Sequence, residues 1–298
     1  MSRLDAAISE RPITQLAIPG SHHSASADVD PKSEVESNLS PMLRALGSTS
    51  MIRETMAKWM QHQKISVKEQ LESGIRYFDF SIEHTANDRF FVVNGLRCNQ
   101  IDDYLDDLYR FLSEQSREIV IVKMDKFTSF SSENLKDFER FIEQKFGDLI
   151  VKQKATSLQN ADAESLAEWS LERCWRKKKQ IIFLFDTAFP LRIAWPISRY
   201  AKVNQSGSDC VEEVIDRLKD TTLSRELEVL QIDESVLSLQ LSDALRNPMT
   251  TFEKQYGRQA TREIVQFIRK NSPKNLNVVA VDFCEEADFA QSIIALNK

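Results

Sequence analysis

Short apolar runs alternate with longer stretches of helical spacing along the whole chain. The clearest apolar runs lie at residues 119–122, 181–185 and 278–283. Between them, hydrophobic residues recur every three or four positions, as on one face of an amphipathic helix. Continuous apolar strands that alternate with helices are typical of a parallel sheet covered on both faces. The pattern therefore predicts an α/β protein.

The same pattern gives the approximate positions of the elements. Strands are predicted at residues 16–19, 75–82, 90–93, 119–122, 181–185, 227–232, 236–241 and 278–283. Helices are predicted at residues 52–73, 101–116, 133–151, 162–177, 209–219 and 258–270. The polar, serine-rich residues 26–50 are predicted to form a long loop. Seven or eight strands favour a barrel over an open sheet, and no linker rich in Pro or Gly divides the chain, so we expect one domain over residues 1–298.

Composition excludes several classes of function. The chain has 298 residues and a formal net charge of −6, from 39 basic and 45 acidic residues. Its 7 glycines are widely spaced, whereas a Walker A loop or a dinucleotide-binding fingerprint needs clustered glycines to bring backbone N–H groups onto phosphates. A sequence pI near 5.5 argues against nucleic acid as a partner, because such binding needs a basic surface.

Cysteine usage and hydropathy indicate a cytoplasmic protein. The four cysteines are Cys98, Cys174, Cys210 and Cys284; none forms a C-x-x-C motif, and we expect reduced thiols and no zinc site among them. The first residues have no apolar core of a secretory signal, and the apolar run at 181–185 is far too short to span a bilayer. Contact with a membrane surface stays open.

Polar residues follow most of the predicted strands. They are His22 and His23, Asp79 and Ser81, Asn94, Lys123 and Asp125, Asp186, and Asp282. In a β/α barrel the carboxyl ends of the strands meet at one mouth, where the chemistry gathers. We therefore expect these side chains to converge there.

Four histidines are candidates for proton transfer. The adjacent pair His22 and His23 is also compatible with a solvated loop after a turn. His62 falls within the predicted helix 52–73 and is interpreted as structural. His84 lies two residues beyond the second strand, which places it at the mouth of the predicted barrel.

Several segments resemble a known family. They are residues 18–22, 59–63, 70–79, 118–121, 146–148, 277–283 and 295–297. In this order and spacing they are similar to the phosphatidylinositol-specific phospholipase C X-domain family, in its branch of small single-domain proteins. The resemblance implies an irregular TIM-type (β/α) barrel that cleaves inositol phospholipids without a cofactor. The implied partner is an inositol phospholipid or inositol phosphate, with membrane contact through loops at the mouth such as 26–50.

The resemblance also implies roles for single residues. His22 matches the histidine that acts as general base, and Asp282 matches the carboxylate that orients it. His23 stands where the family has Asp or Asn, and Asp79 matches an acidic position of the second strand. Lys123 matches a basic position that can face the phosphate. We place His23, Asp79 and Lys123 in the substrate-binding set.

Two positions depart from the family pattern. Ser81 stands where a phosphate-binding arginine or a Ca²⁺ ligand would fall, so we expect no bound metal. Asn94 stands where the second histidine would fall, and an amide cannot deliver a proton at neutral pH. Both positions remain in the expected substrate-binding set. His84 is the candidate replacement acid, and Lys123 or Arg97 the candidate replacement cation.

Three functions therefore stay open. The first is a phospholipase C-like phosphoric diester hydrolase with His22 as base and His84 as acid, its activity weak or lost. Losing a general acid alone costs ~10²–10⁴ in rate. The second is an inactive barrel that binds phosphoinositides or a protein. The third is an interaction protein that uses an outer helix face.

Overall fold

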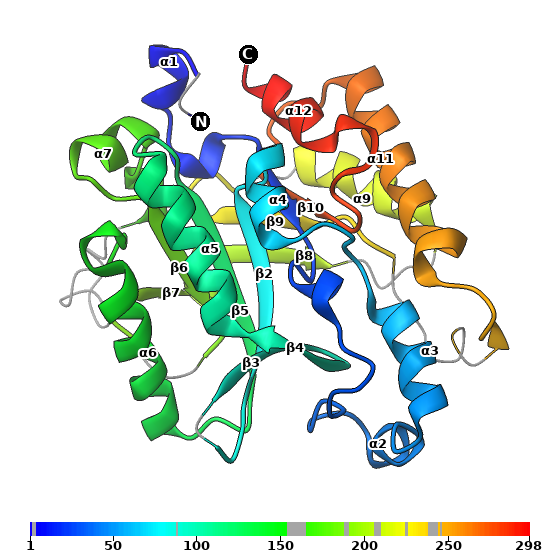
Figure 1. The fold of residues 1–298 in the computed structure, drawn as a ribbon. Coiled ribbons are helices and arrows are strands. Elements are labelled where there is room, and N and C mark those ends of the chain that lie inside the picture. Colours follow the sequence, from blue (N-terminus) through cyan, green and yellow to red (C-terminus); the bar gives the residue numbers. More distant parts are fainter. Residues whose placement is uncertain are drawn as a thin grey trace.

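Eight parallel strands form the centre of the computed structural model (Figure 1). The structure describes residues 1, 4–87, 89–153, 165–187, 191–205, 210–223, 226–237, 244 and 246–298. The strands are β1 (Ile18–Ser21), β2 (Tyr77–His84), β5 (Val120–Thr128), β6 (Ile181–Phe185), β7 (Ala194–Pro196), β8 (Ala201–Gln205), β9 (Leu230–Glu234) and β10 (Val278–Val281). Their order in the sheet is β7-β6-β5-β2-β1-β10-β9-β8, and all of these neighbours are parallel.

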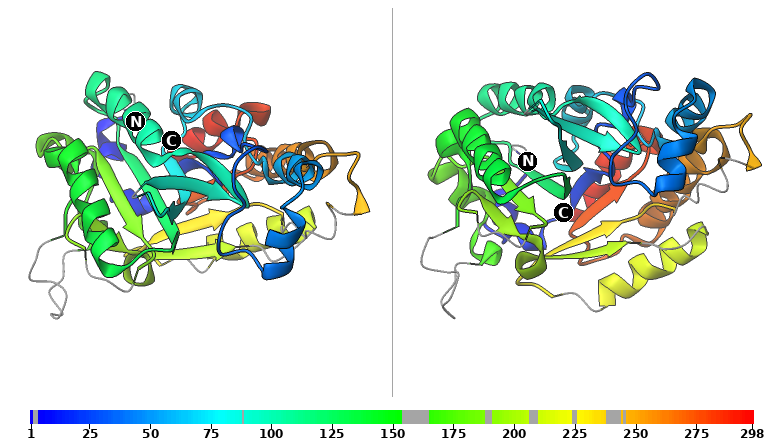
Figure 2. Two further views of the ribbon diagram at one scale, coloured as in Figure 1. Left: turned by 60° about the horizontal axis from the view of Figure 1, so that its bottom comes forward. Right: turned by 90° about the horizontal axis from the view of Figure 1, so that it is seen from below.

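The sheet curls into an irregular barrel surrounded by helices (Figure 2). Its two edge strands, β7 and β8, are joined by the single turn α8 (Ile197–Tyr200). The other helices are α1 (Ala6–Ser9), α2 (Pro41–Leu46), α3 (Ser50–Met60), α4 (Val67–Ser73), α5 (Ile101–Glu114), α6 (Ser132–Phe146), α7 (Leu171–Arg176), α9 (Val211–Leu223), α11 (Arg258–Asn271) and α12 (Phe289–Ile294). The predicted TIM-type α/β barrel is confirmed.

Alternating residues of each strand build two hydrophobic layers. Side chains of one parity fill the barrel interior, among them Tyr77, Ile121, Ile182, Leu184, Trp195 and Ile232. Side chains of the other parity, among them Phe78, Phe80, Val122 and Phe183, face the surrounding helices and cluster with Leu105 of α5 and Phe138 of α6. Both sets are buried, which explains why the strands read as continuous apolar runs in the sequence.

The inward-facing residues change from apolar to charged along the strands. In β2, Tyr77 is followed two residues later by Asp79, and in β5 Ile121 is followed by Lys123. These four residues are paired across the two strands, Tyr77 with Ile121 and Asp79 with Lys123. The apolar core therefore fills the amino-terminal end of the barrel, and a polar layer lies at the carboxyl ends, as the sequence predicted.

The helix predicted at residues 52–73 is two helices. α3 ends at Met60, and Gln61 already has extended backbone angles. A capping box between Ser66 and Glu69 begins α4, because each side chain accepts a hydrogen bond from a backbone N–H that the first turn leaves unpaired. His62 therefore lies in a loop and not on a helix.

Other boundaries also differ from prediction. The expected loop 26–50 contains α2. The strand predicted at 90–93 is β3 (Phe90–Asn94), which forms an antiparallel hairpin with β4 (Leu96–Gln100) beside β2, outside the parallel order. β7 and β8 were not predicted. The described part of the predicted helix 162–177 contains a 3₁₀ turn at Leu166–Glu168 and then α7, and residues 162–164 lie outside the described residues. The predicted strand 236–241 is not a strand at residues 236–237, and residues 238–241 lie outside the described residues.

Gly20 permits the closest packing inside the barrel. A Cβ atom at this position would lie 2.6 Å from Cδ1 of Tyr77, which real Cβ atoms do not tolerate. Tyr77 is fully buried and contributes to the interior core. The absence of a side chain at Gly20 therefore lets the Tyr77 ring occupy the barrel directly below His22.

We expect Gly20→Ala to lower the free energy of unfolding by ~1–3 kcal/mol, the usual cost of overpacking a core. Urea denaturation measures the change as a shift of the midpoint at constant slope. A double variant with Tyr77→Leu should lose less than the sum of the two single variants, because the smaller side chain removes the clash. Full additivity would contradict this steric explanation.

Candidate functional site

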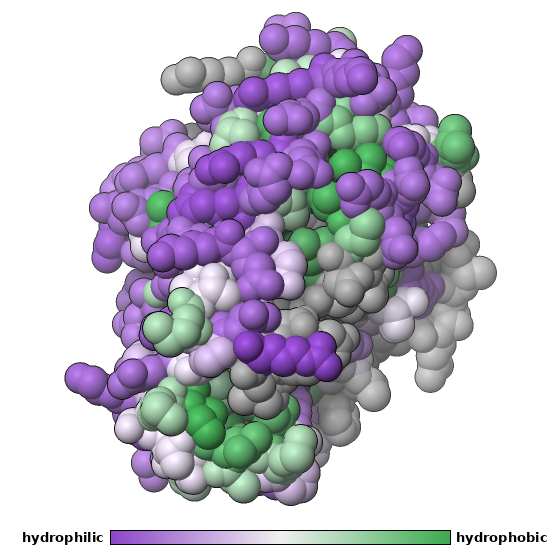
Figure 3. Space-filling model, turned by 90° about the vertical axis from the view of Figure 1, so that its right-hand side faces the viewer, coloured by the Kyte–Doolittle hydropathy of each residue, from purple (hydrophilic) through white to green (hydrophobic). Residues whose placement is uncertain are grey.

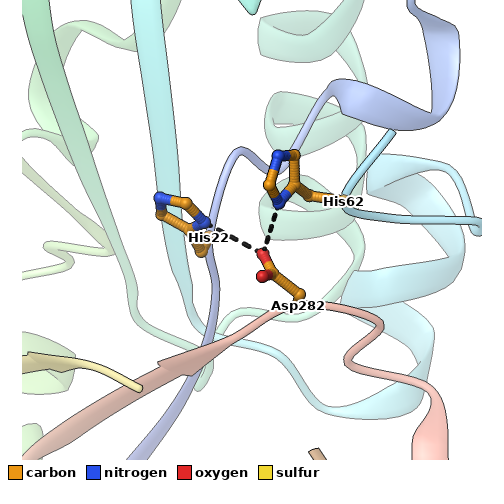
Figure 4. A group of neighbouring side chains, drawn as sticks. All are labelled: His22, His62 and Asp282. Carbon is orange, nitrogen blue, oxygen red and sulfur yellow. Dashed lines mark hydrogen bonds and ion pairs between the residues drawn. The ribbon is translucent and has the colours of Figure 1, made fainter. Parts of the chain in front are cut away.

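Two histidines share one carboxylate oxygen at the mouth of the barrel (Figure 4). Nδ1 of His22 lies 2.9 Å from Oδ1 of Asp282, and Nδ1 of His62 lies 3.0 Å from the same oxygen. The side chains of His62 and Asp282 are 5% and 3% exposed, and that of His22 is 12% exposed. The contact between His22 and Asp282 follows the sequence expectation, whereas the contribution of His62 does not.

The amide of Gln63 holds the segments that carry these residues. Its Nε2 donates to the backbone carbonyls of His22 and Val281, both at 2.9 Å. Its Oε1 accepts the backbone N–H of Cys284 at 3.1 Å. Gln63 thus joins the end of β1 to the end of β10, and it fixes the separation between His22 and Asp282.

Burial and charge shift the pKa values of this group in opposite directions. Burial disfavours the charged form of His22, but the Asp282 carboxylate outweighs it, so the pKa of His22 is raised. Burial alone would raise the pKa of Asp282, but the charges of His62 and His22 hold it down at about 2. Burial and the neighbouring imidazoles lower the pKa of His23 well below its ordinary value.

A second polar group surrounds Lys123. Its Nζ lies 2.6 Å from Glu234, 3.1 Å from Asp79 and 3.2 Å from Asp125. Burial would lower the pKa of Lys123, but these three carboxylates raise it well above its ordinary value. Burial raises the pKa of Asp125, whereas Asp79 keeps a lowered pKa because Lys123 outweighs its burial. Lys123 and these three carboxylates together form the lysine group, which carries a net charge of −2 when all four side chains are ionised.

His23 and Asp79 connect the two groups. The backbone N–H of His23 donates to Oδ2 of Asp79 at 3.3 Å. The ring centroids of His22 and His23 are 4.0 Å apart, and those of His23 and His62 are 5.1 Å apart. Two sets within the described part of the chain place possible metal-ligand atoms within 4.8 Å of one another: His22 with His62 and Asp282, and His22 with His23 and Asp79.

The two positions that depart from the family pattern have other partners. The Ser81 hydroxyl donates to Oδ1 of Asp125 at 2.8 Å, and Nδ2 of Asn94 donates to the backbone carbonyl of Met60 at 2.6 Å. Arg97 forms ion pairs with Glu83 and Glu34. Ser81 thus lies beside the lysine group, while Asn94 anchors the end of α3.

The structure does not bring His84 to His22. Ser21 is level with Phe78 in the sheet, so Asp79 lies near the level of His22. His84 follows five residues later in β2, ~16 Å further along the strand. Its ring packs against Phe90 and Phe130, at centroid distances of 5.3 and 5.7 Å. The expected acid–base pair of His22 and His84 is therefore wrong on geometry.

Sequence reasoning also missed His62, Gln63, Glu234 and the exposure of Asp186. The helix predicted at residues 52–73 continues across the polar residues 61–64, which lie in the loop, although the Ser66/Glu69 capping box is a local signal for a new helix. Glu234 closes a strand that was predicted to end two residues earlier. Asp186 is exposed after β6 and is not among the contacts of either polar group.

Comparisons with known proteins define the class of the barrel. Over the whole chain, the fold matches a phosphatidylinositol-specific phospholipase C from Listeria monocytogenes, with a TM-score of 0.69, 15% identity and 97% of that chain covered. A mutant of the enzyme from Staphylococcus aureus matches with a TM-score of 0.67, 18% identity and 96% coverage. At this identity the likeness establishes the fold.

The sequence comparisons show similarity to one family. The model of the phosphatidylinositol-specific phospholipase C X domain matches residues 48–177. The whole chain is 26% identical to mouse PI-PLC X domain-containing protein 2, covering 86% of it, and 24% identical to human PI-PLC X domain-containing protein 3, covering 92% of it. The chain is thus similar to this X-domain family, through the family model over residues 48–177 and through these relatives over its whole length.

We expect Asp282→Asn to lower the pKa of His22. In the wild type Asp282 is the main group that opposes the effect of burial on the pKa of His22, so without it only the smaller effects of Glu234 and Asp79 remain. A pH titration of the histidine ring protons by NMR measures the change. Asp186→Asn, at an exposed strand end, is the matched control and should leave the titration unchanged. An unaltered His22 titration in Asp282→Asn would refute the assignment.

Proposed function

We propose that this protein is a phospholipase C-like phosphoric diester hydrolase that acts on inositol phospholipids. The observation that carries the proposal is the pair of imidazoles bonded to one carboxylate oxygen. With both Nδ1 atoms directed at Asp282, the Nε2 atoms of His22 and His62 are the positions available for proton exchange. Similarity to the X-domain family and the barrel fold support the substrate class.

The proposed reaction uses the two imidazoles as base and acid. Nε2 of His22 accepts the proton of the inositol 2-hydroxyl, and the freed oxygen forms a bond to phosphorus. The bond from phosphorus to the diacylglycerol oxygen breaks, and doubly protonated His62 gives its Nε2 proton to that oxygen. One positive charge thereby passes from His62 to His22. Asp282 compensates it in both states, so the net charge of the three side chains does not change.

The surroundings of Lys123 predict a slow reaction. Ser81 occupies the position of the family's arginine, and the three carboxylates around Lys123 exceed its charge. A phosphate at the mouth therefore meets the net negative charge of the lysine group, in which three carboxylates surround one ammonium. Loss of one preorganised charge-stabilising contact typically costs ~10²–10³ in rate. We therefore propose turnover well below that of relatives that retain this cation.

A second candidate is a barrel that binds inositol phosphates or a protein without turnover. The observation that favours it is the engagement of Asn94 with Met60, which removes the position of the family's second histidine from the mouth. The two candidates differ in one result. The hydrolase releases inositol phosphate from lipid, whereas the binding module gives saturable calorimetric binding of inositol phosphates and no release.

An apolar surface on α2 and α3 supports contact with lipid. Met42 and Met51 are 67% and 74% exposed, and Met51 lines a groove of about 440 Å³ with Met249. Hydrophobic side chains gather at this lower end of the molecule in Figure 3, where Figure 1 places α2 and α3. α3 spans ~16 Å and ends beside His62, so the surface lies on the rim of the site.

This surface is proposed to rest on the membrane that presents the substrate. No helix in the described ranges is long and apolar enough to cross a bilayer. Peripheral contact therefore has to come from side chains such as Met42 and Met51. The exposed Arg44 and Lys58 on the same two helices would face the anionic headgroups.

We expect His22→Ala and His62→Ala each to lower the hydrolysis rate by ~10²–10⁴, because each removes one proton-transfer group. The measurement is release of water-soluble inositol phosphate from vesicles that contain ring-labelled phosphatidylinositol. His84→Ala is the matched control, because the structure places this imidazole away from Asp282. Release that is equal in wild type and His22→Ala would end the hydrolase proposal.

We expect the double variant Met42→Asp, Met51→Asp to bind vesicles containing phosphatidylinositol at least ~10-fold more weakly than the wild type, since two exposed apolar groups are replaced by charges that the anionic surface repels. Cosedimentation with vesicles measures the loss. Leu223→Asp changes an equally exposed apolar residue, 85% exposed on α9, and should bind as the wild type does. Equal binding by all three proteins would contradict the assigned surface.

A further inference from the structure

The shared carboxylate brings together atoms that can also hold a metal ion. Oδ1 of Asp282 and the Nδ1 atoms of His22 and His62 come from three separate loops, after β10, β1 and α3, and converge on one point (Figure 4). All three side chains offer one ligand atom within 4.8 Å of the others. Two imidazoles and a carboxylate are a donor set typical of first-row transition metals.

The separations fit such an ion. Metal–nitrogen and metal–oxygen bonds of ~2.0–2.1 Å place two ligand atoms ~2.9 Å apart at a right angle, and ~3.4 Å apart at the tetrahedral angle. The observed nitrogen–oxygen distances are 2.9 and 3.0 Å. Both nitrogen–oxygen distances thus equal those of a right-angled arrangement, and a tetrahedral one would lengthen each by less than ~0.5 Å.

The surroundings favour a cation. Asp282 and His62 are almost fully buried, and Gln63 and the packing of Phe252 against the His62 ring fix the backbone and ring positions. His22 and His23 connect this point to the lysine group, where three carboxylates face one ammonium. The excess negative charge lowers the energy of a divalent cation at the neighbouring imidazoles.

We propose that His22, His62 and Asp282 bind a divalent first-row transition metal ion through Nδ1, Nδ1 and Oδ1, with water in the remaining positions. Hard cations such as Ca²⁺ and Mg²⁺ prefer sites built from oxygen alone, so the two imidazoles select ions such as Zn²⁺ and Co²⁺.

The site would act as an inhibitory switch, a consequence that rests on the proposed hydrolase function. A metal on Nδ1 of neutral His22 displaces the proton that Asp282 accepts, and this proton moves to Nε2. The Nδ1 proton of His62 is released to solvent. The Nε2 lone pair of His22 that would take the inositol hydroxyl proton is then lost. The Zn²⁺-bound protein does not cleave lipid, and removal of the ion restores the base.

The test is calorimetric titration of the full chain, treated with EDTA and dialysed, with ZnCl₂, together with the visible absorption of added Co²⁺. We expect one saturable site in the wild type. His62→Ala should weaken Zn²⁺ binding by at least ~10–100-fold, the loss seen even for groups that only support a ligand. His84→Ala also removes one imidazole, but one outside the cluster, and should leave affinity unchanged.

NMR of the wild type covers the case in which His62→Ala fails to fold. Zn²⁺ should then shift the ring signals of His22 and His62 and leave those of His84 in place. No saturable site in the wild type, equal affinity in folded His62→Ala, or shifts confined to other histidines would each overturn the proposal.

A hydrolysis assay with Zn²⁺ and then EDTA tests the switch separately. If the wild type does not hydrolyse lipid at all, the proposed function fails, while calorimetry and NMR still decide the metal site. If it does hydrolyse lipid, we expect Zn²⁺ to stop release and EDTA to restore it. Full activity at saturating Zn²⁺ would overturn the switch.

Discussion

The site depends on one buried carboxylate that accepts two imidazole contacts at the same oxygen. A buried Asp282 would be costly without partners, and His22 and His62 compensate both its charge and its hydrogen-bonding capacity. The compensation is reciprocal, because the carboxylate also fixes the orientation and the protonated nitrogen of each ring. Gln63 keeps the segments in place through three backbone groups. The chemistry of the mouth therefore follows from the meeting of loops that are far apart in the sequence.

The parallel sheet and the polar carboxyl ends of its strands could be predicted, because apolar strands that alternate with helices are typical of a parallel barrel. β1 and β10 are neighbours with Ser21 opposite Val281, so His22 and Asp282 emerge side by side. The outward orientation of His84 could also be predicted, because His84 shares parity in its strand with the outward-facing Phe78 and Phe80. The position of His62 could not be predicted in the same way, because neither helical nor strand periodicity describes a six-residue loop. Its contact with Asp282 depends on tertiary packing, which local pattern does not encode.

Two groups of opposite charge lie side by side at the mouth of the barrel. The imidazole pair can carry positive charge toward an anionic phosphate, while the lysine group beside it stays negative because three carboxylates surround one ammonium. The balance between them determines whether an inositol phosphate is cleaved, only held, or excluded in favour of a cation. Ser81 matters here because its hydroxyl supplies a hydrogen bond to Asp125 and no charge, so it leaves the balance on the negative side.

The packing of the Tyr77 ring against Gly20 also bears on how substrate and product reach and leave the histidines. Together with Trp195 and the aliphatic side chains around it, this ring closes the floor beneath the histidines. The barrel on the far side of the histidines from the strand ends is therefore filled with buried apolar side chains. Under the proposed chemistry, the cleaved headgroup must leave by the way it came, before another lipid can enter, while the diacylglycerol stays behind in the bilayer.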